Sequence, residues 1–155
     1  MDLFRRRVAS PVGPWVVEGD DHAVTHVFLP HELTDASSGR APRAVAEAAS
    51  QLEEYFDGQR RRFTASLAPT PATPFQRDVW DALAAIPYGE VRTYGDVAAA
   101  VGRPRAMRAV GNANHVNPWP VIVPCHRVVA AAGLGGYGGG TDVKAFLLDL
   151  EGATY

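Results

Sequence analysis

The residue in this sequence that is best suited to nucleophilic chemistry is Cys125, the only cysteine of the chain. It stands in Pro124-Cys125-His126-Arg127, between two β-branched runs. Because a proline interrupts strand pairing, the sequence predicts a kink or turn at the thiol. His126 can act as a base, and Arg127 adds positive charge that would favour a thiolate, the nucleophilic form of cysteine. The tetrapeptide therefore indicates nucleophilic chemistry.

The segment upstream of Cys125 must shape the backbone around it. Asn117 precedes a proline eight residues before the thiol and can fix a turn through its side-chain amide. On a regular strand, adjacent residues point to opposite faces. His126 can therefore reach the Cys125 sulfur only if the backbone turns between them or a water bridges them.

Helices are expected on the amino-terminal side of the thiol. Thr73 followed by Pro74 is typical of a helix start, with an N-cap and a proline in the first turn. A second helix is expected to begin at Thr93, where Asp96 completes a capping-box-like pattern, and to end at Gly102.

A third helix is expected to open at Pro104, so that a tight turn joins it to the second as in a helix-turn-helix. Arg105 and Arg108 would lie on it, in the place of a DNA-recognition helix. An ordinary corner between two helices has the same spacing. Residues 92–127 contain five arginines and one acid, a net charge of +4 on a chain of net charge -2, which suits one face that meets a polyanion. Arginine is common throughout the chain, which weakens any argument from a single arginine.

The first half shows strands and a helix but no catalytic pattern. Residues 15–18 and 23–29 flank a Gly-Asp turn, which predicts an antiparallel hairpin or meander. Helical spacing over 42–58 predicts one helix, and 62–67 one further strand. Alternating prolines then predict a stiff linker. The domains expected are an α/β domain over 1–68, a linker over 69–73 and a mainly helical domain over 74–155.

Length and composition favour an ordinary globular protein. The chain has 155 residues, of which 46% are hydrophobic and 21% charged, and no apolar run approaches the ~20 residues that span a bilayer. The charged start is in the wrong order for a secretory signal, and one cysteine excludes an internal disulfide. A cytoplasmic protein without a membrane partner is expected. His22, His26 and His31 could join Asp20 or Asp21 at a metal, but a hairpin does not constrain that geometry, and neither metal nor cofactor is expected.

The chemical centre resembles the O6-alkylguanine-DNA alkyltransferase family. Pro124-Cys125-His126-Arg127 is similar to its signature, and further matching segments surround it. These are Pro87–Gly95, Arg108–Gly111, Asn117-Pro118, Ile122–Val128, Gly136–Gly140 and Leu147–Gly152. The resemblance is strong over residues 74–152. It implies an RNase-H-like first domain and a winged-helix-like second domain with a helix-turn-helix.

The resemblance also implies the chemistry. The alkyl group on O6 of guanine, or on O4 of thymine, would pass to Cys125. Glu151, His126 and a water would form a relay to the thiol, and Asn117 would brace the turn. Tyr94 would supply a proton to the departing base.

Further implied contacts hold the base and the DNA. The Val128 carbonyl and the loop with Tyr137 and Gly138 would hold the base. Arg108 would enter the minor groove of double-stranded DNA and replace the extruded nucleotide. The remaining implied DNA contacts are Thr93, Tyr94, Arg103, Arg105, Gly111 and Asn114. The protein would be a monomer in solution, with cooperative assembly on DNA as an option.

The cysteine count adds an expectation about turnover. A thioether at Cys125 is not reversed by thiol exchange, and the chain has no second thiol. Each molecule should therefore act once. Two alternatives stay open: a Cys–His thiol hydrolase oriented by Asn117 or Glu151, and a winged-helix binder with an incidental cysteine. Some segments depart from the family pattern, namely His115-Val116, the short stretch between Cys125 and Tyr137, and the large Trp119.

Overall fold

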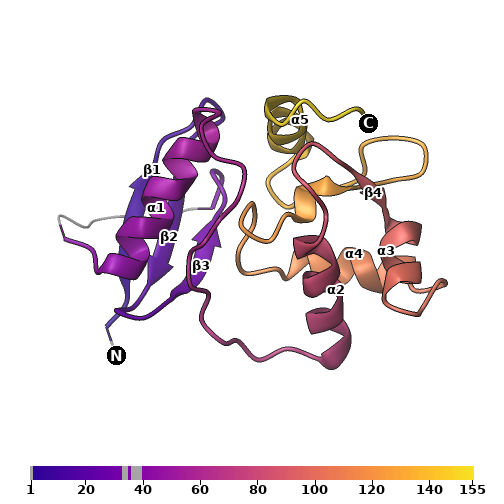
Figure 1. Cartoon of the computed structure of the whole chain (residues 1–155), viewed down its shortest axis with the longest axis horizontal. Coiled ribbons are helices and arrows are strands. Elements are labelled where there is room, and N and C mark those ends of the chain that lie inside the picture. The colour runs from indigo at the N-terminus through magenta and orange to yellow at the C-terminus, as the bar shows by residue number, and fades with distance from the viewer. Residues whose placement is uncertain (1, 33–34, 36–39) are drawn as a thin grey trace. The chain divides into compact units, whose positions relative to one another are not determined.

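The computed structural model describes residues 2–32, 35 and 40–155 (Figure 1). The chain divides into two compact units, Met1–Thr70 and Pro71–Tyr155. Within the described ranges, no helix is both long and apolar enough to cross a bilayer.

The first unit is built on a three-stranded antiparallel sheet. Its strands β1 (Phe4–Val8), β2 (Trp15–Gly19) and β3 (Val24–Phe28) pair in the order β1-β2-β3. The predicted meander is therefore confirmed for β2 and β3. Nothing in the sequence predicted β1, because three consecutive arginines hide its alternation.

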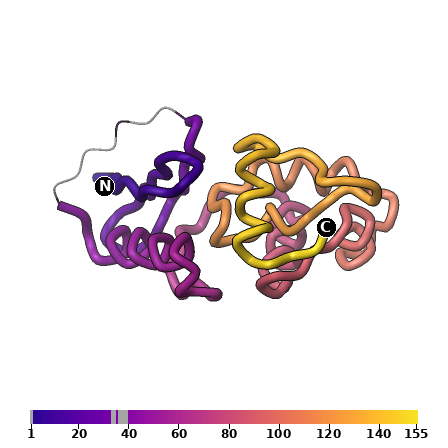
Figure 2. The backbone as a smooth tube through the Cα atoms, turned by 90° about the horizontal axis from the view of Figure 1, so that it is seen from above, coloured from indigo at the N-terminus to yellow at the C-terminus, as the bar shows by residue number. Residues whose placement is uncertain are grey.

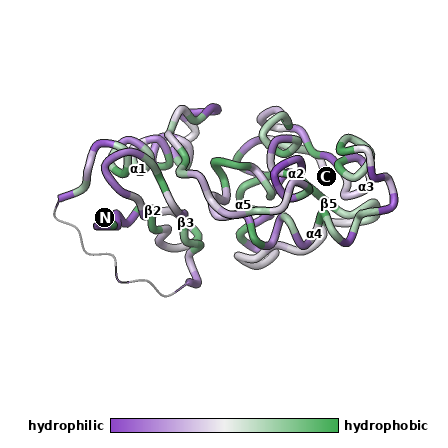
Figure 3. Tube along the Cα trace, turned by 90° about the horizontal axis from the view of Figure 1, so that it is seen from below, coloured by the Kyte–Doolittle hydropathy of each residue, from purple (hydrophilic) through white to green (hydrophobic). Residues whose placement is uncertain are grey.

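Helix α1 (Arg43–Phe56) covers the sheet of the first unit, as the spacing over 42–58 predicted (Figure 2). Hydrophilic and hydrophobic residues alternate along it, which is typical of a helix with one buried face (Figure 3). Its buried residues include Val45, Leu52 and Tyr55, and the Phe56 ring lies 5.3 Å from that of Trp15, centroid to centroid. This unit presents a hydrophobic core and no catalytic cluster.

The strand predicted over residues 62–67 is wrong. A single parallel bridge joins Leu67 to Val24, and the backbone of Val24 bonds to Ser66 and Ala68 at 2.8 Å each. Thr64 bonds instead to the Gln51 side chain of α1, through its backbone N–H at 3.0 Å and its hydroxyl at 2.7 Å. A helix side chain therefore satisfies the backbone N–H that a strand partner would have used.

The second unit is mainly helical. Its elements are α2 (Pro74–Ala84), β4 (Arg92–Thr93), α3 (Tyr94–Ala100), α4 (Met107–His115), the 3-10 helix η1 (Cys125–Arg127), β5 (Val128–Val129) and α5 (Thr141–Leu150). Strands β4 and β5 form a short parallel pair, and α2, α3 and α4 pack on one another. Helix α5, labelled in Figure 1, packs on η1.

Both predicted helix starts are confirmed. The Thr73 hydroxyl accepts from the Gln76 N–H at 3.1 Å, and the Gln76 side chain accepts from the Thr73 N–H at 3.0 Å. Thr93 and Asp96 form the same reciprocal pair, at 3.0 and 2.9 Å. Each pair satisfies two of the N–H groups that a helix start leaves unbonded. The second pair fixes the place of Tyr94, the first residue of α3.

The predicted start of the third helix at Pro104 is wrong. Helix α4 begins at Met107, because the Ala106 N–H bonds to the Arg103 carbonyl at 2.9 Å and closes a separate turn first. Arg105 therefore lies in the turn before the helix, and only Arg108 lies on the helix itself.

Two tryptophans hold α4 against its neighbours. The Trp80 indole N–H, from α2, donates to the Ala113 carbonyl in the last turn of α4 at 2.9 Å. Trp119 stands edge-on to Trp80, with the ring centroids 5.7 Å apart. The large side chain at position 119 is thus part of the core that supports α4.

We expect Trp80→Phe to lower the free energy of unfolding by about 2 kcal/mol, because it leaves the Ala113 carbonyl buried without its donor. Urea denaturation of the whole chain measures this change. Asp81→Asn, at the exposed neighbouring position, is the control and should unfold like the wild type. Equal stability of the two variants would show that the indole bond contributes nothing.

Candidate active site around Cys125

Cys125 begins the 3-10 turn η1, so the predicted kink at the thiol is confirmed. Its N–H bonds to the Val123 carbonyl at 2.8 Å, and the Arg127 N–H bonds to the Pro124 carbonyl at 3.0 Å. These bonds replace the strand pairing that Pro124 prevents. The side chain of Cys125 is only 6% exposed.

Burial raises the pKa of the Cys125 thiol, because the thiolate loses its hydration. Two neighbours act against that increase: a hydrogen bond with the Asn117 side chain, and the positive charge of Lys144. A polar side chain and a cation therefore act on the buried thiol. Its ionisation depends on groups that the protein itself supplies.

Asn117 lies at the turn that leads to the thiol. Its amide nitrogen donates to the Val123 carbonyl at 2.9 Å, and its oxygen accepts from the Trp119 N–H at 3.0 Å. One buried side chain thus bonds both arms of the turn, which is the geometry that a bracing residue needs.

His126 and Glu151 lie 25 positions apart in sequence and meet in the core. The Nε2 of His126, which is fully buried, lies 2.7 Å from the Glu151 carboxylate at the C-terminal end of α5. A carboxylate only accepts, so Nε2 carries the hydrogen and Nδ1 keeps its lone pair. Among the described residues, no group bonds to the buried Nδ1. The lone pair is therefore available to take up a proton.

Burial lowers the pKa of His126, although the hydrogen bond and charge of Glu151 act in the opposite direction. The imidazole is therefore neutral in the folded protein near neutral pH. A neutral imidazole is the form that can act as a base.

Arg127 does not serve the thiol as the sequence suggested. Its Nε and Nη2 donate to the two oxygens of Glu151 at 2.8 and 3.0 Å, and its Nη1 donates to the Ile86 carbonyl at 2.7 Å. The Gly89 N–H adds a further bond to the same carboxylate at 3.1 Å. Arg127 therefore positions Glu151, because a bidentate guanidinium fixes a carboxylate in one orientation.

The cation beside the thiol is Lys144, which sequence reasoning missed. It is fully buried on α5, and its Nζ donates to the Val128 carbonyl at 2.5 Å and to the Gly136 carbonyl at 3.1 Å. One signal in the sequence could have found it. Lys144 is the only lysine of a chain whose other basic residues are all arginine, and it stands on the hydrophobic side of the last helix.

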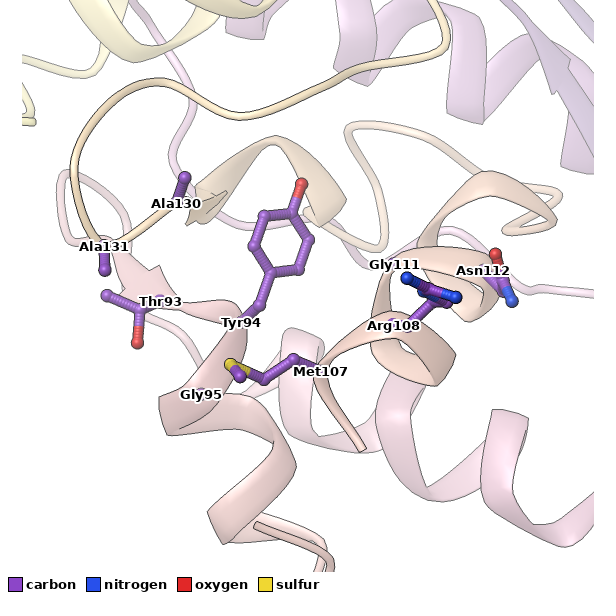
Figure 4. A pocket seen from close by; sticks show the side chains of 9 residues that line it. All are labelled: Thr93, Tyr94, Gly95, Met107, Arg108, Gly111, Asn112, Ala130 and Ala131. Carbon is purple, nitrogen blue, oxygen red and sulfur yellow. The ribbon is translucent and has the colours of Figure 1, made fainter. Parts of the chain in front are cut away.

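A cavity of about 560 Å³ opens beside the start of α3 (Figure 4). Its walls come from β4, α3, α4 and the segment after β5. The lining residues are Thr93, Tyr94, Gly95, Met107, Arg108, Gly111, Asn112, Ala130 and Ala131. Four predicted site residues, Thr93, Tyr94, Arg108 and Gly111, therefore share one cavity.

Tyr94 relates this cavity to the thiol. Burial raises the pKa of Tyr94, and the Cys125 charge raises it further. Its hydroxyl donates to the Gly136 carbonyl at 3.4 Å. Gly135 has a φ of +77°, and a Cβ there would lie 3.1 Å from the Tyr94 ring, so the close approach of the loop requires glycine.

The remaining predicted contacts lie outside the lining of the cavity. Arg103 and Arg105 are exposed in the turn before α4, and Arg103 lies over the Phe75 ring at 5.9 Å. Asn114 is half-buried with its Oδ1 enclosed. Tyr137 and Gly138 belong to the loop between β5 and α5.

The histidines of the first unit show no metal geometry. His26 stacks on Phe28 with 4.4 Å between ring centroids, and Asp20 accepts from the backbone N–H groups of His22 and Ala23. Over residues 2–32, 35 and 40–155, no group of three or more His, Cys, Asp or Glu side chains could hold a metal ion.

We expect the stability of the protein to fall as the pH decreases below 6.5, where His126 takes up a proton in the unfolded chain but not in the fold. The unfolded state then binds one more proton, so the free energy of unfolding falls by up to about 1.4 kcal/mol per pH unit. Urea denaturation between neutral and mildly acidic pH measures this slope. His126→Gln should reduce the slope of the free energy of unfolding against pH. His22→Gln, at an exposed position, should leave that slope unchanged.

Known proteins of one family resemble this chain over most of its length. Residues 74–153 match the family model described as 6-O-methylguanine DNA methyltransferase, DNA binding domain. A methylated-DNA–protein-cysteine methyltransferase of Methanosarcina acetivorans is 48% identical over 93% of this chain and 95% of its own length. The constitutive one of Bacillus subtilis is 44% identical, over 94% and 93%.

Solved structures show the same likeness. The Mycobacterium tuberculosis OGT in complex with DNA superposes with a TM-score of 0.85 at 43% identity, covering 96% of this chain and 92% of that one. The M. tuberculosis O6-methylguanine methyltransferase superposes with a TM-score of 0.83 at 41% identity, over 97% and 93%. Together with the cysteine, histidine and glutamate of the site, these matches show that the chain belongs to the methylated-DNA–protein-cysteine methyltransferase family.

Proposed function

We propose that this protein repairs O6-alkylguanine in double-stranded DNA by moving the alkyl group irreversibly to the sulfur of Cys125. The observation that carries the proposal is the arrangement of His126. Its Nε2 is held by Glu151, and its Nδ1 is buried with a free lone pair in the residue next to the thiol. That arrangement provides a base for the one nucleophile of the chain.

The reaction balances without a cofactor. His126 takes the thiol proton, directly or through a water, and Glu151 stabilises the imidazolium that forms. The thiolate attacks the alkyl carbon, an S–C bond forms, and the C–O6 bond breaks with its electron pair passing to the base. The guanine anion takes a proton from the hydroxyl of Tyr94, a residue of the cavity wall. The imidazolium of His126 then returns its proton through solvent to the Tyr94 phenolate, so that both groups regain their starting states. The products are guanine and a Cys125 thioether, and O4-alkylthymine would react in the same way.

Other groups would hold the base. The carbonyls of Cys125 and Val128 would accept from the exocyclic amine, since a carbonyl has two lone pairs and Lys144 uses one at Val128. The loop with Tyr137 and Gly138 would pack over the ring. Asn117 would keep the turn and the thiol in register.

A base inside a duplex cannot reach the cavity, so the nucleotide must be extruded. Arg108, on α4 and in the cavity wall, would enter from the minor groove and fill the vacated space. Arg103 and Arg105 in the turn, with Thr93, Gly111 and Asn114, would contact the backbone of the DNA. Helices α3 and α4 would then serve as the helix-turn-helix of a winged-helix-like domain over 74–155, behind the linker 69–73 and an RNase-H-like domain over 1–68.

The need for a free thiol at Cys125 limits where and how often the protein can act. The acceptor must remain reduced, which suits the cytoplasm. The thioether has no resolving thiol, so each molecule acts once. We propose a monomer in solution that can assemble cooperatively on DNA.

Incubation with excess O6-methylguanine duplex should add the mass of one methylene group to each protein molecule and then stop. Intact-mass analysis measures the adduct, and chromatography of the digested DNA counts the guanines restored. One repaired base per molecule is expected. Many repaired bases, or repair with an unmodified protein mass, would contradict the proposal and favour a hydrolase.

Cys125→Ala is the companion variant to this experiment. It should bind the duplex and repair nothing. Absence of transfer by the wild type, together with equal DNA binding by the wild type and Cys125→Ala, would identify the protein as a binding module whose cysteine is incidental.

Arg108→Ala should slow transfer from duplex DNA relative to transfer from the free base O6-benzylguanine, because extrusion loses the side chain that fills the stack. The ratio of the two rates should fall on the order of tenfold, since extrusion costs a few kcal/mol. Single-turnover assays on both substrates measure the ratio. Arg77→Ala, an exposed arginine of α2 outside the proposed contacts, should leave the ratio unchanged. An unchanged ratio in Arg108→Ala would remove the residue from the extrusion step.

A further inference from the structure

Lys144 is unusual among the cations of this protein. The chain has 15 basic residues, and Lys144 is the only lysine among them. It is 0% exposed, and no carboxylate within the described residues lies at ion-pair distance from its Nζ. Arg127 is also buried, but it pairs with Glu151. A buried ammonium without a carboxylate is costly, so its retention calls for a reason at this site.

The two carbonyls around Nζ show why a lysine stands here. An ammonium is a compact charge with three rotatable donors, and two of them bond to Val128 and Gly136 at 2.5 and 3.1 Å. A guanidinium is a broad planar fork whose geometry matches a carboxylate, so an arginine would not reproduce two carbonyl bonds around one nitrogen. Position 144 therefore selects the amine in a chain that otherwise uses arginine.

We propose that Lys144 is a positioning residue of the alkyl-acceptor site, which ties the loop after β5 to the start of β5, three residues from Cys125, and supplies the positive charge that stabilises the Cys125 thiolate. This inference rests on the proposed function, since it concerns the same nucleophile.

The positioning part follows from what the two carbonyls join. Val128 lies three residues after Cys125 and opens β5. Gly136 lies in the glycine-rich loop, and its carbonyl also accepts from the Tyr94 hydroxyl at 3.4 Å. The ammonium lies 5.9 Å from the centre of the Tyr94 ring. Lys144 thus joins α5, β5 and the loop close to Tyr94, the proposed proton donor.

The charge part follows from the groups around Nζ. Cys125 and His126 on η1 and Tyr94 on α3 are the titratable groups within its electrostatic reach. The Lys144 charge lowers the pKa of the Cys125 thiol, and the thiolate in turn raises the pKa of Lys144. Burial acts more strongly on Lys144 and lowers its pKa to about 8. The ammonium is therefore present at neutral pH and is lost in mild alkali, just where more thiolate would otherwise form.

Because the chain has one lysine, labelling with lysine that carries ¹³C at Cε yields a single side-chain signal, whose pH titration reports Lys144 directly. Reciprocity requires that the thiolate and the ammonium shift each other's pKa equally. Lys144 should therefore titrate at lower pH in Cys125→Ser than in the wild type. Identical titration curves in the two proteins would overturn the proposal, and this arm needs no substitution at Lys144.

The second arm measures the thiol. In Lys144→Met, which keeps most of the volume, the pKa of Cys125 should rise by about one unit, the low end of the effect of a nearby charge. Alkylation by iodoacetamide as a function of pH measures that pKa without DNA, so it remains informative even if the repair activity is absent. Transfer from O6-benzylguanine should slow about tenfold at neutral pH, in line with the smaller thiolate fraction. An unchanged thiol pKa would refute the charge role.

Two further variants separate charge from position. Lys144→Arg keeps the charge but not the fit between the carbonyls, so its thiol pKa should lie between those of the wild type and Lys144→Met. Asp142→Asn, exposed in the first turn of the same helix, is the matched control and should change neither the thiol pKa nor the rate. A change in the Cys125 pKa in Asp142→Asn as large as that in Lys144→Met would show a general charge effect and overturn the assignment.

Discussion

The site depends on one buried carboxylate. Glu151 accepts hydrogen bonds from His126, twice from Arg127 and from the Gly89 backbone, and its side chain has no exposure to solvent. A carboxylate in that position is tolerable only because donors surround it. Those donors come from η1 and from the turn after α2, while Glu151 itself ends α5. One charge thus joins three segments that lie far apart in the sequence, and it also determines which nitrogen of His126 carries the hydrogen.

The two buried cations, Arg127 and Lys144, act on different groups of the site. Arg127 neutralises Glu151 and anchors to the Ile86 carbonyl, so it acts on the histidine through the carboxylate. Lys144 has no carboxylate within the described part of the chain and acts on the thiol and on the loop carbonyls. Burial, helped by the charges of Arg127 and Lys144, keeps the imidazole neutral, while the Lys144 charge lowers the pKa of the thiol. Both conditions favour a thiol that must lose a proton inside the protein.

The start of a helix can be predicted from the sequence where it depends only on neighbouring residues. The capping boxes at Thr73 and Thr93 could be predicted because they involve residues three positions apart. The start of α4 could not, because a turn at 103–106 competes with the helix for the same backbone groups. Strand β1 was not predicted, and the strand over 62–67 was predicted wrongly, for a related reason. Strand pairing depends on partners that are distant in sequence. The position of Arg105 in the turn rather than on α4 is a direct consequence.

The sequence by itself indicated the proposed nucleophile, its histidine neighbour and the family, because these depend on residue types and on spacing within short segments. It also indicated the kink at Cys125, since proline acts locally. Only the tertiary structure decided which cation serves the thiol. Arg127 follows His126 directly in the sequence, yet its guanidinium bonds to Glu151. Lys144 lies on a helix 19 positions after Cys125, and its ammonium bonds to the Val128 carbonyl. Electrostatic interaction depends on distance in space and on burial, and neither quantity can be counted along a chain.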